Sequence, residues 1–224
     1  MIKPVIFNSA DGSDSVLHPI WNSYYHSKHG ALSESLKVYI EYGLAYRSQI
    51  QNSIKIFEFG FGTGLNAYLT LLFAIQNGVT VNYQTIENMP LLEDTWSRLN
   101  YPNIQTALGS SNEYFQLLHR LSWGQEFIVC NNFLLTKNNS SFESFKPDSE
   151  FDIIYFDAFG PEIQPDLWTL ESLEKLYFML APGGILLTFC AKGQFKRDLR
   201  SLGFIVEALS GPIGKREVTR AIKL

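Results

Sequence analysis

The sequence predicts a doubly wound, Rossmann-like α/β fold, with a mainly parallel sheet and an N-terminal elaboration. Three observations support this prediction. From residue 54 onward, short apolar runs typical of buried strands alternate with helix-like segments. Gly60, Gly62 and Gly64 follow the first of these runs and stand directly before an apolar helix pattern. Acidic residues close three of the runs, at the edge of the sheet where ligands bind in such folds.

The segment before the glycines is expected to form a hairpin and a helix. We assign residues 1–52 to this elaboration and residues 53–224 to the main domain. Asp11 and Gly12 stand between two short apolar runs, an arrangement typical of a hairpin turn. A helix is predicted over about 33–47, with Ser33 as its N-cap.

The main domain is expected to alternate strands and helices. Strands are predicted at 54–59, 80–86, 127–130, 133–136, 151–156, 185–190, 205–209 and 217–222. Helices are predicted at 65–76, from Pro90 onward, in the second half of 102–123, at 169–180 and at 192–202. Because Glu58, Glu87 and Asp157 all fall where parallel strands end, we expect them to share one ligand site.

Length and composition exclude several classes of protein. The 224 residues are 46% hydrophobic, which suits one globular domain with a small extension. No apolar run reaches the roughly 18 residues of a membrane span, and no signal peptide is evident, so we expect a cytoplasmic protein. Cys130 and Cys190 are expected to be buried free thiols. No metal-ligand spacing exists, so no metal is predicted.

The glycine segment predicts a binding site for a cofactor. Its spacing, G-x-G-x-G, differs from the dinucleotide fingerprint G-x-G-x-x-G, and Glu58 precedes it. A carboxylate there would repel a pyrophosphate but suits the ammonium group of an amino acid. S-adenosylmethionine, which has an adenosine end and an amino-acid end, fits this pattern. The alternative is a glycine-rich turn without a ligand.

Two further acids predict contacts at the ends of the ligand. Glu87 lies 23 residues after Gly64, where an acid can accept hydrogen bonds from both ribose hydroxyls; the alternative is a surface glutamate before a helix. Asp157 follows a buried strand and suits an amine acceptor, with Phe159 and Tyr25 as candidate walls for a base. The alternative for Asp157 is a carboxylate that only caps a turn.

Charge is distributed unevenly along the chain. The net charge of -4 argues weakly against nucleic acid, but eight basic and three acidic residues lie between Lys192 and Leu224. Such a local basic face can bind phosphates, although it can equally be a solvated surface. His26 and His29, in a polar aromatic loop, are weaker candidates for moving a proton or holding a phosphate.

Together these motifs resemble a known family. The chain is similar to the methyltransferase domain of the bacterial bifunctional enzyme that completes 5-methylaminomethyl-2-thiouridine in tRNA, and to its stand-alone relatives. The resemblance implies a seven-stranded class I S-adenosylmethionine-dependent methyltransferase that acts on the aminomethyl nitrogen of the wobble uridine. The FAD-dependent oxidase half of that enzyme is expected to be absent here. The similar segments are HGALSE (29–34), EFGFGTGLN (58–66), YFDAFGP (155–161), PDLW (165–168), APGG (181–184) and GPIGKRE (211–217).

The resemblance also implies roles for single residues. Asp157 and Phe159 are expected at the reacting amine. Larger family members carry Gly-Asp near the adenine, where this chain has residues 136–139, so Asn138 is assigned to adenine instead. The expected cofactor residues are Glu58, Gly60, Gly62, Gly64, Asn66, Glu87, Asn138 and Asp157. The expected tRNA-binding residues are Tyr25, His29, Lys192, Lys196, Arg197, Lys215 and Arg216.

Two rival functions stay open at this point. An aminopropyltransferase of the spermidine-synthase type uses a similar fold and an aspartate near an amine, but it needs several acids for a polyamine. A non-catalytic tRNA-binding or partner subunit would not need the intact glycines and strand-end acids. The expected partners are tRNA and the separate enzymes that install the aminomethyl group.

Overall fold

The structure of this chain, a computed structural model, describes residues 4–224. Within them lies an eight-stranded sheet of order β10-β11-β9-β8-β4-β5-β7-β6. Its middle strands run parallel, and β11 and β6 run antiparallel to their neighbours. The strands are β4 (Ser53–Phe59), β5 (Thr80–Ile86), β6 (Glu126–Cys130), β7 (Phe133–Asn138), β8 (Phe151–Phe156), β9 (Leu180–Thr188), β10 (Phe204–Ser210) and β11 (Glu217–Lys223).

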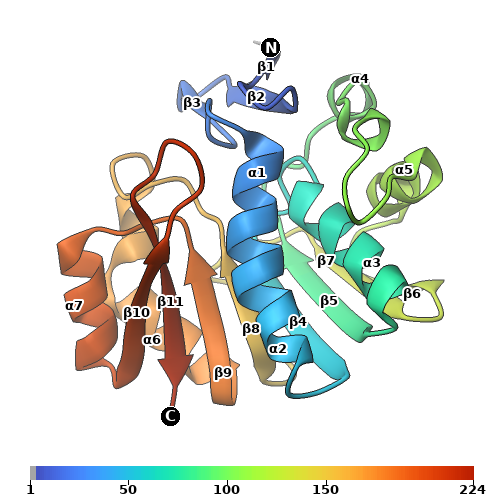
Figure 1. Cartoon of the computed structure of the whole chain (residues 1–224). Helices are drawn as coiled ribbons and strands as arrows, with labels where there is room; N and C mark the ends of the chain where they lie inside the picture. The colour runs from blue at the N-terminus through green and yellow to red at the C-terminus, as the bar shows by residue number, and fades with distance from the viewer. Residues whose placement is uncertain (1–3) are drawn as a thin grey trace.

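Helices cover both faces of this sheet, which confirms the predicted doubly wound fold (Figure 1). One face carries the continuous helix α1 (Ala31–Ser35), η1 (Leu36–Ala45) and α2 (Tyr46–Ser48), together with α3 (Leu65–Asn77); the other carries α6 (Leu170–Met179) and α7 (Gly193–Ser201). Successive side chains of β8 point to opposite faces of the sheet and so enter two hydrophobic cores. Ile153 and Tyr155 join one buried cluster, and Ile154 and Phe156 join the other.

The sheet has the eight strands predicted along the chain, whereas the resemblance implied seven. The strand at one edge is β6, which pairs antiparallel with β7 and carries a bulge between Ile128 and Cys130. A short, bulged edge strand limits pairing with other chains. Two smaller expectations also need correction. The helix expected from Pro90 begins at Glu93 as the single turn α4 (Glu93–Trp96), and Cys130 is only half-buried, whereas Cys190 is buried.

The remaining helices are short and lie near the ligand-binding end. They are η2 (Tyr101–Asn103), α5 (Asn112–Arg120) and η3 (Pro165–Trp168). None of the helices within residues 4–224 combines the length and apolar character that a membrane crossing requires.

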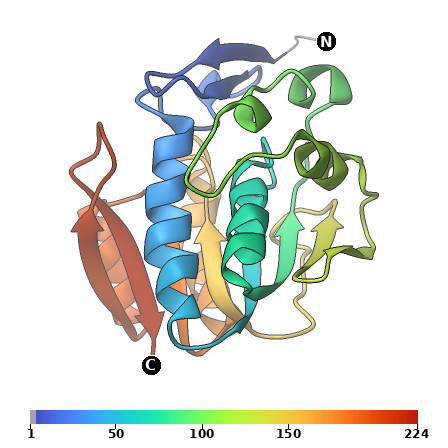
Figure 2. The ribbon, with the colours of Figure 1, turned by 45° about the vertical axis from the view of Figure 1, so that its right-hand side comes forward.

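The N-terminal segment forms a small sheet of its own over the carboxyl ends of the parallel strands (Figure 2). The predicted hairpin is present as β1 (Val5–Asn8) and β2 (Asp14–His18), and β3 (Ser23–Tyr24) adds a third strand. The segment thereby forms a roof above the edge where ligands are expected.

The helix after this small sheet begins at Ala31, so the prediction of Ser33 as N-cap was wrong. Its N-terminal N–H groups are instead satisfied by the hairpin turn. The N–H groups of residues 31, 32 and 33 donate to side-chain oxygens of Ser9, Ser13 and Asp11, at 3.3, 3.0 and 2.8 Å. The hairpin turn therefore caps the helix, although it lies about 20 residues earlier in the sequence. The π-helical segment η1 then packs against β8, β9 and α3, in the body of the fold.

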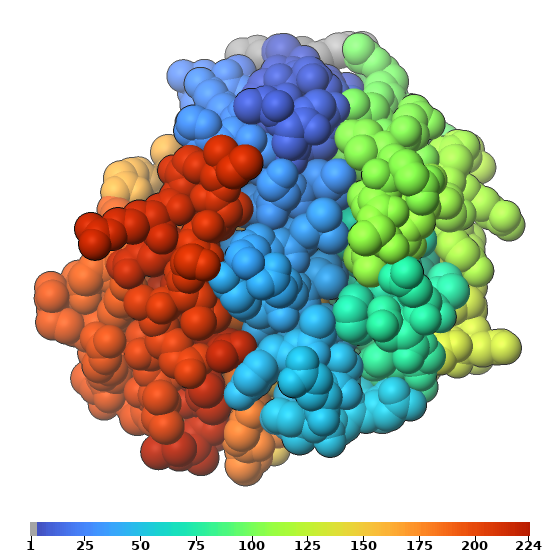
Figure 3. All heavy atoms as spheres, viewed as in Figure 1, coloured from blue at the N-terminus to red at the C-terminus, as the bar shows by residue number. Residues whose placement is uncertain are grey.

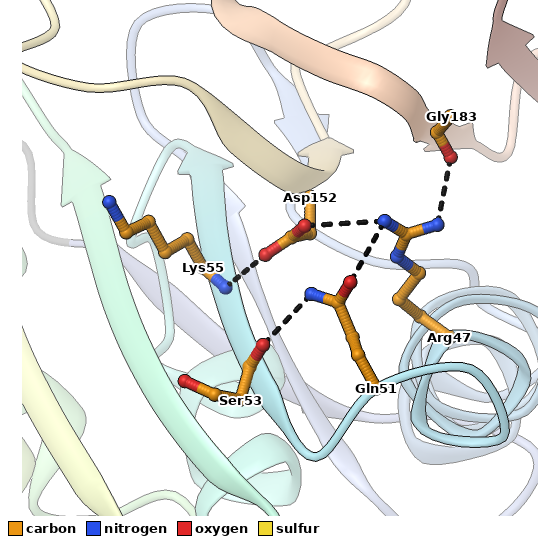
Figure 4. A network of polar contacts seen from close by, with 6 residues as sticks. All are labelled: Arg47, Gln51, Ser53, Lys55, Asp152 and Gly183. Atoms are coloured by element: carbon orange, nitrogen blue, oxygen red, sulfur yellow. Dashed lines mark hydrogen bonds and ion pairs between the residues drawn. The ribbon is translucent and has the colours of Figure 1, made fainter.

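A polar network fixes this helix to the end of the sheet opposite the roof (Figure 4). The Arg47 guanidinium donates to the Gly183 carbonyl oxygen at 3.0 Å and pairs with the Asp152 carboxylate at 3.3 Å. The other oxygen of Asp152 accepts a hydrogen bond from the Lys55 backbone N–H at 2.8 Å. One arginine thus connects α2 with β8 and β9, and through Asp152 with β4.

Candidate cofactor and active site

A cavity of about 520 Å³ lies between the roof and the carboxyl ends of the central strands. This volume is typical of small-molecule sites. Four segments of the main domain supply much of its wall: the glycine loop, the end of β5, residues 140–143 and the loop after β8. The N-terminal segment contributes residues from His18 to Ser27. The predicted convergence of strand ends on one site is therefore present.

The glycine loop is held against the end of β5. The N–H groups of Gly60 and Phe61 both donate to the Ile86 carbonyl oxygen, at 3.1 and 3.2 Å. Gly62 has φ +51°, and a Cβ there would meet the Tyr25 ring at 3.0 Å. Gly64 caps α3 with φ +73°, and its Cβ would meet another side chain at 2.7 Å. Side chains at these two positions would therefore strain the loop. Gly60 and Gly62 line the cavity, and Gly64 begins the helix beside it.

Glu87 lines the cavity and also ties the glycine loop in place. Its carboxylate accepts hydrogen bonds from the N–H groups of Gly62 at 3.0 Å and Met89 at 2.8 Å. Burial raises the pKa of Glu87, and these hydrogen bonds oppose the rise. Each carboxylate oxygen can accept a further hydrogen bond. Glu87 can therefore support the loop and still accept hydrogen bonds from a ribose.

Asp157 and Asn66 form the polar floor of the cavity. Asn66 Nδ2 donates to Asp157 Oδ2 at 2.8 Å, and both residues line the cavity. Burial raises the pKa of Asp157, while the hydrogen bond from Asn66 opposes that rise. Asn66 is 97% buried and its Oδ1 has no partner within residues 4–224.

Two predicted cofactor residues do not line the cavity. Glu58 is 1% exposed and lies beneath the floor, where burial, followed by the charge of Asp157, raises its pKa well above the usual range. By the alternation of β4 it lies on the same face of the sheet as Ile54 and Ile56, where Asn66 and Tyr83 surround it. Asn138 ends β7 and donates to the Thr85 carbonyl oxygen at 3.4 Å. Residues 140–143, just after Asn138, border the cavity instead.

An aromatic cluster forms the wall next to Asp157. Phe159 lies edge-on to Trp21 and Tyr25, with ring centroids 4.9 and 5.2 Å away. Trp21 in turn stacks on His18 at 4.1 Å. The Phe159 backbone is fixed on both sides, by Gln164 Oε1 at 3.0 Å and by the Trp168 indole N–H at 2.8 Å. The two predicted walls, Tyr25 and Phe159, thus meet, and the N-terminal roof adds two rings that the sequence did not single out.

The predicted basic residues fall into two groups. Lys215 lines the cavity and is ion-paired with Glu34. The others lie outside it: Lys192 pairs with Glu162, Lys196 pairs with Glu217 at 2.5 Å, and Arg197 and Arg216 are exposed. His29 is also exposed and packs under the loop 211–216, where a Cβ on Gly214 would meet its ring at 2.3 Å. The predicted basic residues therefore do not form one continuous surface.

Sequence reasoning underrated His26 and missed Thr63 and Glu34. His26 Nε2 lies 2.7 Å from the Thr63 hydroxyl, and both side chains line the cavity. Burial lowers the pKa of His26 to about 4, so its imidazole is neutral near pH 7. Glu34 stands at the end of the HGALSE segment, and that position was the one signal available. Within residues 4–224, no group of three or more His, Cys, Asp or Glu side chains could hold a metal ion.

Comparisons with known proteins agree with this geometry. A family model described as S-adenosyl-L-methionine-dependent methyltransferase matches residues 137–224. The crystal structure of MNMC2 from Aquifex aeolicus has the same fold, with a TM-score of 0.77 at 22% identity, covering 99% of this chain and 70% of that one. The chain thus has the predicted class I methyltransferase fold, and its residues 137–224 match a family of S-adenosyl-L-methionine-dependent methyltransferases.

Two curated relatives match most of this chain. The tRNA 5-methylaminomethyl-2-thiouridine biosynthesis bifunctional protein MnmC of Pseudomonas fluorescens (strain Pf0-1) is 26% identical over 235 residues, covering 98% of this chain and 35% of the relative. MnmC of Leptospira interrogans serogroup Icterohaemorrhagiae serovar copenhageni (strain Fiocruz L1-130) is 28% identical over 215 residues, covering 88% and 32%. This chain spans about a third of the length of these relatives, and the match confirms the predicted resemblance.

The residues present fit S-adenosylmethionine. The close approach of Gly62 to Tyr25 leaves no space for a Cβ in the loop, and the carboxylate of Glu34 lines the cavity wall. Glu87 offers carboxylate oxygens at the end of β5. These groups match the ammonium and ribose hydroxyls of that cofactor.

Proposed function

We propose that this chain methylates the aminomethyl nitrogen of 5-aminomethyl-2-thiouridine at the wobble position of tRNA. The observation that carries the proposal is the position of Asp157, a half-buried carboxylate in the cavity floor, held by Asn66 and bordered by aromatic rings. A carboxylate can orient the N–H groups of an amine, and rings can stack against a flat base. The names of the relatives contain 5-methylaminomethyl-2-thiouridine, the nucleoside that this methylation would produce.

In this mechanism the chain positions an amine beside the methyl group of the cofactor. S-adenosylmethionine, when bound, supplies an electrophilic methyl group. Asp157 accepts a hydrogen bond from the acceptor amine and directs its lone pair to the methyl carbon. The rings of Phe159, Tyr25 and Trp21 form the wall for the base. Positioning of this kind contributes much of the rate enhancement in direct transfer reactions.

The amine must be neutral when it attacks. A protonated amine has no lone pair, so activity should rise with pH until the amine is largely deprotonated. Asp157 raises the pKa of a nearby amine by favouring its charged form. Its role is therefore to orient the amine, and the proton lost after transfer passes to water or buffer.

Mass spectrometry of tRNA nucleosides tests the proposal. Purified protein is incubated with methyl-labelled S-adenosylmethionine and tRNA that carries 5-aminomethyl-2-thiouridine, and the tRNA is digested. We expect one labelled methyl group on that nucleoside. The matched control is the same tRNA with unmodified uridine at the wobble position, which should stay unlabelled. Label on another nucleoside, or no label although the cofactor binds, would refute the proposed substrate.

A further inference from the structure

An ion pair in the cavity wall has no role in the function proposed so far. Glu34, near the start of the helix that follows the roof, pairs with Lys215 of the loop 211–216. The Glu34 side chain is 5% exposed and that of Lys215 is 26% exposed. The Lys215 ammonium also lies 4.1 Å from the centre of the Phe189 ring, and all three residues line the cavity. The pair is therefore fixed, largely buried and accessible to a ligand.

The loop that carries Lys215 lies against the helix that carries Glu34. In the space-filling view the C-terminal hairpin rests on the long helix near the N-terminal sheet (Figure 3). The Tyr42 hydroxyl donates to the Ser210 carbonyl oxygen at 3.0 Å, and Arg220 Nη1 donates to the Tyr42 carbonyl oxygen at 3.1 Å. These contacts hold the two elements together without the help of the ion pair.

The amino-acid end of the cofactor still needs partners for its two charges. Glu58, the residue expected to bind the ammonium group, lies beneath the cavity floor. Within residues 4–224, Lys215 is the one lysine or arginine that lines the cavity. Transferring a zwitterion into a cavity costs desolvation energy unless matched charges meet it. The Glu34–Lys215 pair presents one charge of each sign.

We infer that the Glu34–Lys215 pair is the docking site for the zwitterionic amino-acid end of S-adenosylmethionine. Lys215 binds the carboxylate, and Glu34 binds the ammonium group. The inference concerns the cofactor alone and holds whatever the acceptor is. It moves Lys215 from the predicted tRNA surface to the cofactor site. It also gives the site a preference for S-adenosylmethionine over its decarboxylated form, the donor of an aminopropyltransferase.

Calorimetric titration with three ligands tests this assignment. S-adenosylmethionine carries both charges, decarboxylated S-adenosylmethionine lacks the carboxylate, and 5′-methylthioadenosine lacks the entire amino-acid end. In the wild-type protein, S-adenosylmethionine should bind about tenfold to a hundredfold more tightly than the decarboxylated ligand, the range of one charged hydrogen bond. Lys215→Met should remove most of that difference. Glu34→Gln should weaken both ammonium-bearing ligands by a similar factor.

Neither substitution should change the affinity for 5′-methylthioadenosine more than about twofold, because that ligand cannot reach the pair. The matched control is Lys37→Met, which breaks an exposed pair with Glu41 on the same helix and should alter no affinity. Equal losses for all three ligands would show that the pair only supports the fold, and would overturn the inference. If the variants do not fold, the wild-type protein still decides, because equal affinity for the decarboxylated and complete cofactors excludes a carboxylate site.

Discussion

Asp157 is the residue that the proposed mechanism places beside the acceptor amine. It directly follows β8, lies in the cavity floor and accepts a hydrogen bond from Asn66 at 2.8 Å. Phe159, two residues later, joins the aromatic wall. Because the backbone of Phe159 is anchored at both its N–H and its carbonyl group, the loop places the carboxylate and the ring in a fixed relation. Such preorganisation is what transfer to an oriented amine requires.

Asp157→Ala should lower turnover much more than it lowers cofactor affinity. The lost contact is to the acceptor amine, and a charged hydrogen bond is worth about 1.5–3 kcal/mol, so we expect about a tenfold to hundredfold loss in single-turnover rate. The two measurements are calorimetric cofactor binding and single-turnover methylation of aminomethyl-uridine tRNA. Asp157→Asn, which keeps an acceptor oxygen, should retain more activity than Asp157→Ala. Near-normal turnover of the alanine variant would remove Asp157 from the mechanism.

At the scale of elements, the hairpin turn and the helix after it behave as one unit. Asp11 connects them: its carboxylate accepts from the N–H and hydroxyl groups of Ser33 and from the N–H of Ser13, at 2.8, 2.7 and 3.0 Å. Partial burial raises the pKa of Asp11, but these hydrogen bonds outweigh it and lower the pKa from 3.8 to about 2. The ionised carboxylate is thus part of the folded connection.

Asp11→Ala should destabilise the fold by about 1–2 kcal/mol, the cost of losing a helix N-cap. Because the folded-state pKa lies below the unfolded value, the ionised carboxylate contributes stability above about pH 4, and this is lost as the pH falls from about 4 through about 2. Denaturant unfolding at pH 7, 4 and 2.5 measures both effects. Asp11→Asn keeps an acceptor but cannot titrate, so it should lose part of the pH dependence in that window. An unchanged pH profile in Asp11→Asn would contradict the assignment.

Arg47 is the corresponding connection at the other end of the sheet. Arg47→Met should cost about 3 kcal/mol, because the Asp152 carboxylate, with 15% of its side chain exposed, loses its counter-charge. Thermal unfolding measures the loss, and cofactor affinity should stay unchanged because Asp152 begins the strand whose other end carries Asp157. The double variant Arg47→Met/Asp152→Asn should recover part of the stability, since no unpaired charge remains. A double variant no more stable than Arg47→Met would contradict this explanation.

The elements were predictable because hydrophobic periodicity is a local property. The limits of β5 and β8 agree with the prediction, and the hairpin was indicated by Asp11-Gly12. The incorrect N-cap prediction shows the limit of local sequence patterns, since the groups that cap the helix lie some 20 residues before it. Glu58 shows the same limit at the site. Its position at a strand end was correct, but whether its side chain faced the cavity or the sheet depended on the packing around Asn66 and Tyr83, which no spacing encodes.

At the scale of the whole molecule, the question is how an acidic protein would bind tRNA. The net charge is -4, and the fold neutralises part of the basic C-terminal segment internally. Lys192, Lys196 and Lys215 each pair with a glutamate. Arg197, Arg200 and Arg216 are exposed, and among the described residues no carboxylate is ion-paired with any of them. The unpaired positive charge of this segment is therefore concentrated on three arginines, of which Arg197 and Arg216 were predicted to bind tRNA.

We expect Arg197→Glu and Arg216→Glu to raise the apparent Michaelis constant for tRNA more than Lys196→Glu, because Lys196 is already neutralised by Glu217 at 2.5 Å. Each lost phosphate contact should lower the slope of log affinity against log salt by about 1. Binding of tRNA at several salt concentrations measures this slope. A steeper fall of tRNA affinity with salt in the wild-type protein than in the arginine variants would agree with phosphate contacts by these arginines. Lys55→Glu is the control, because that lysine lies near the opposite end of the sheet, beside the network in Figure 4. Salt-independent binding, or equal effects of Lys55 and the two arginines, would mean that tRNA approaches the cavity by another face.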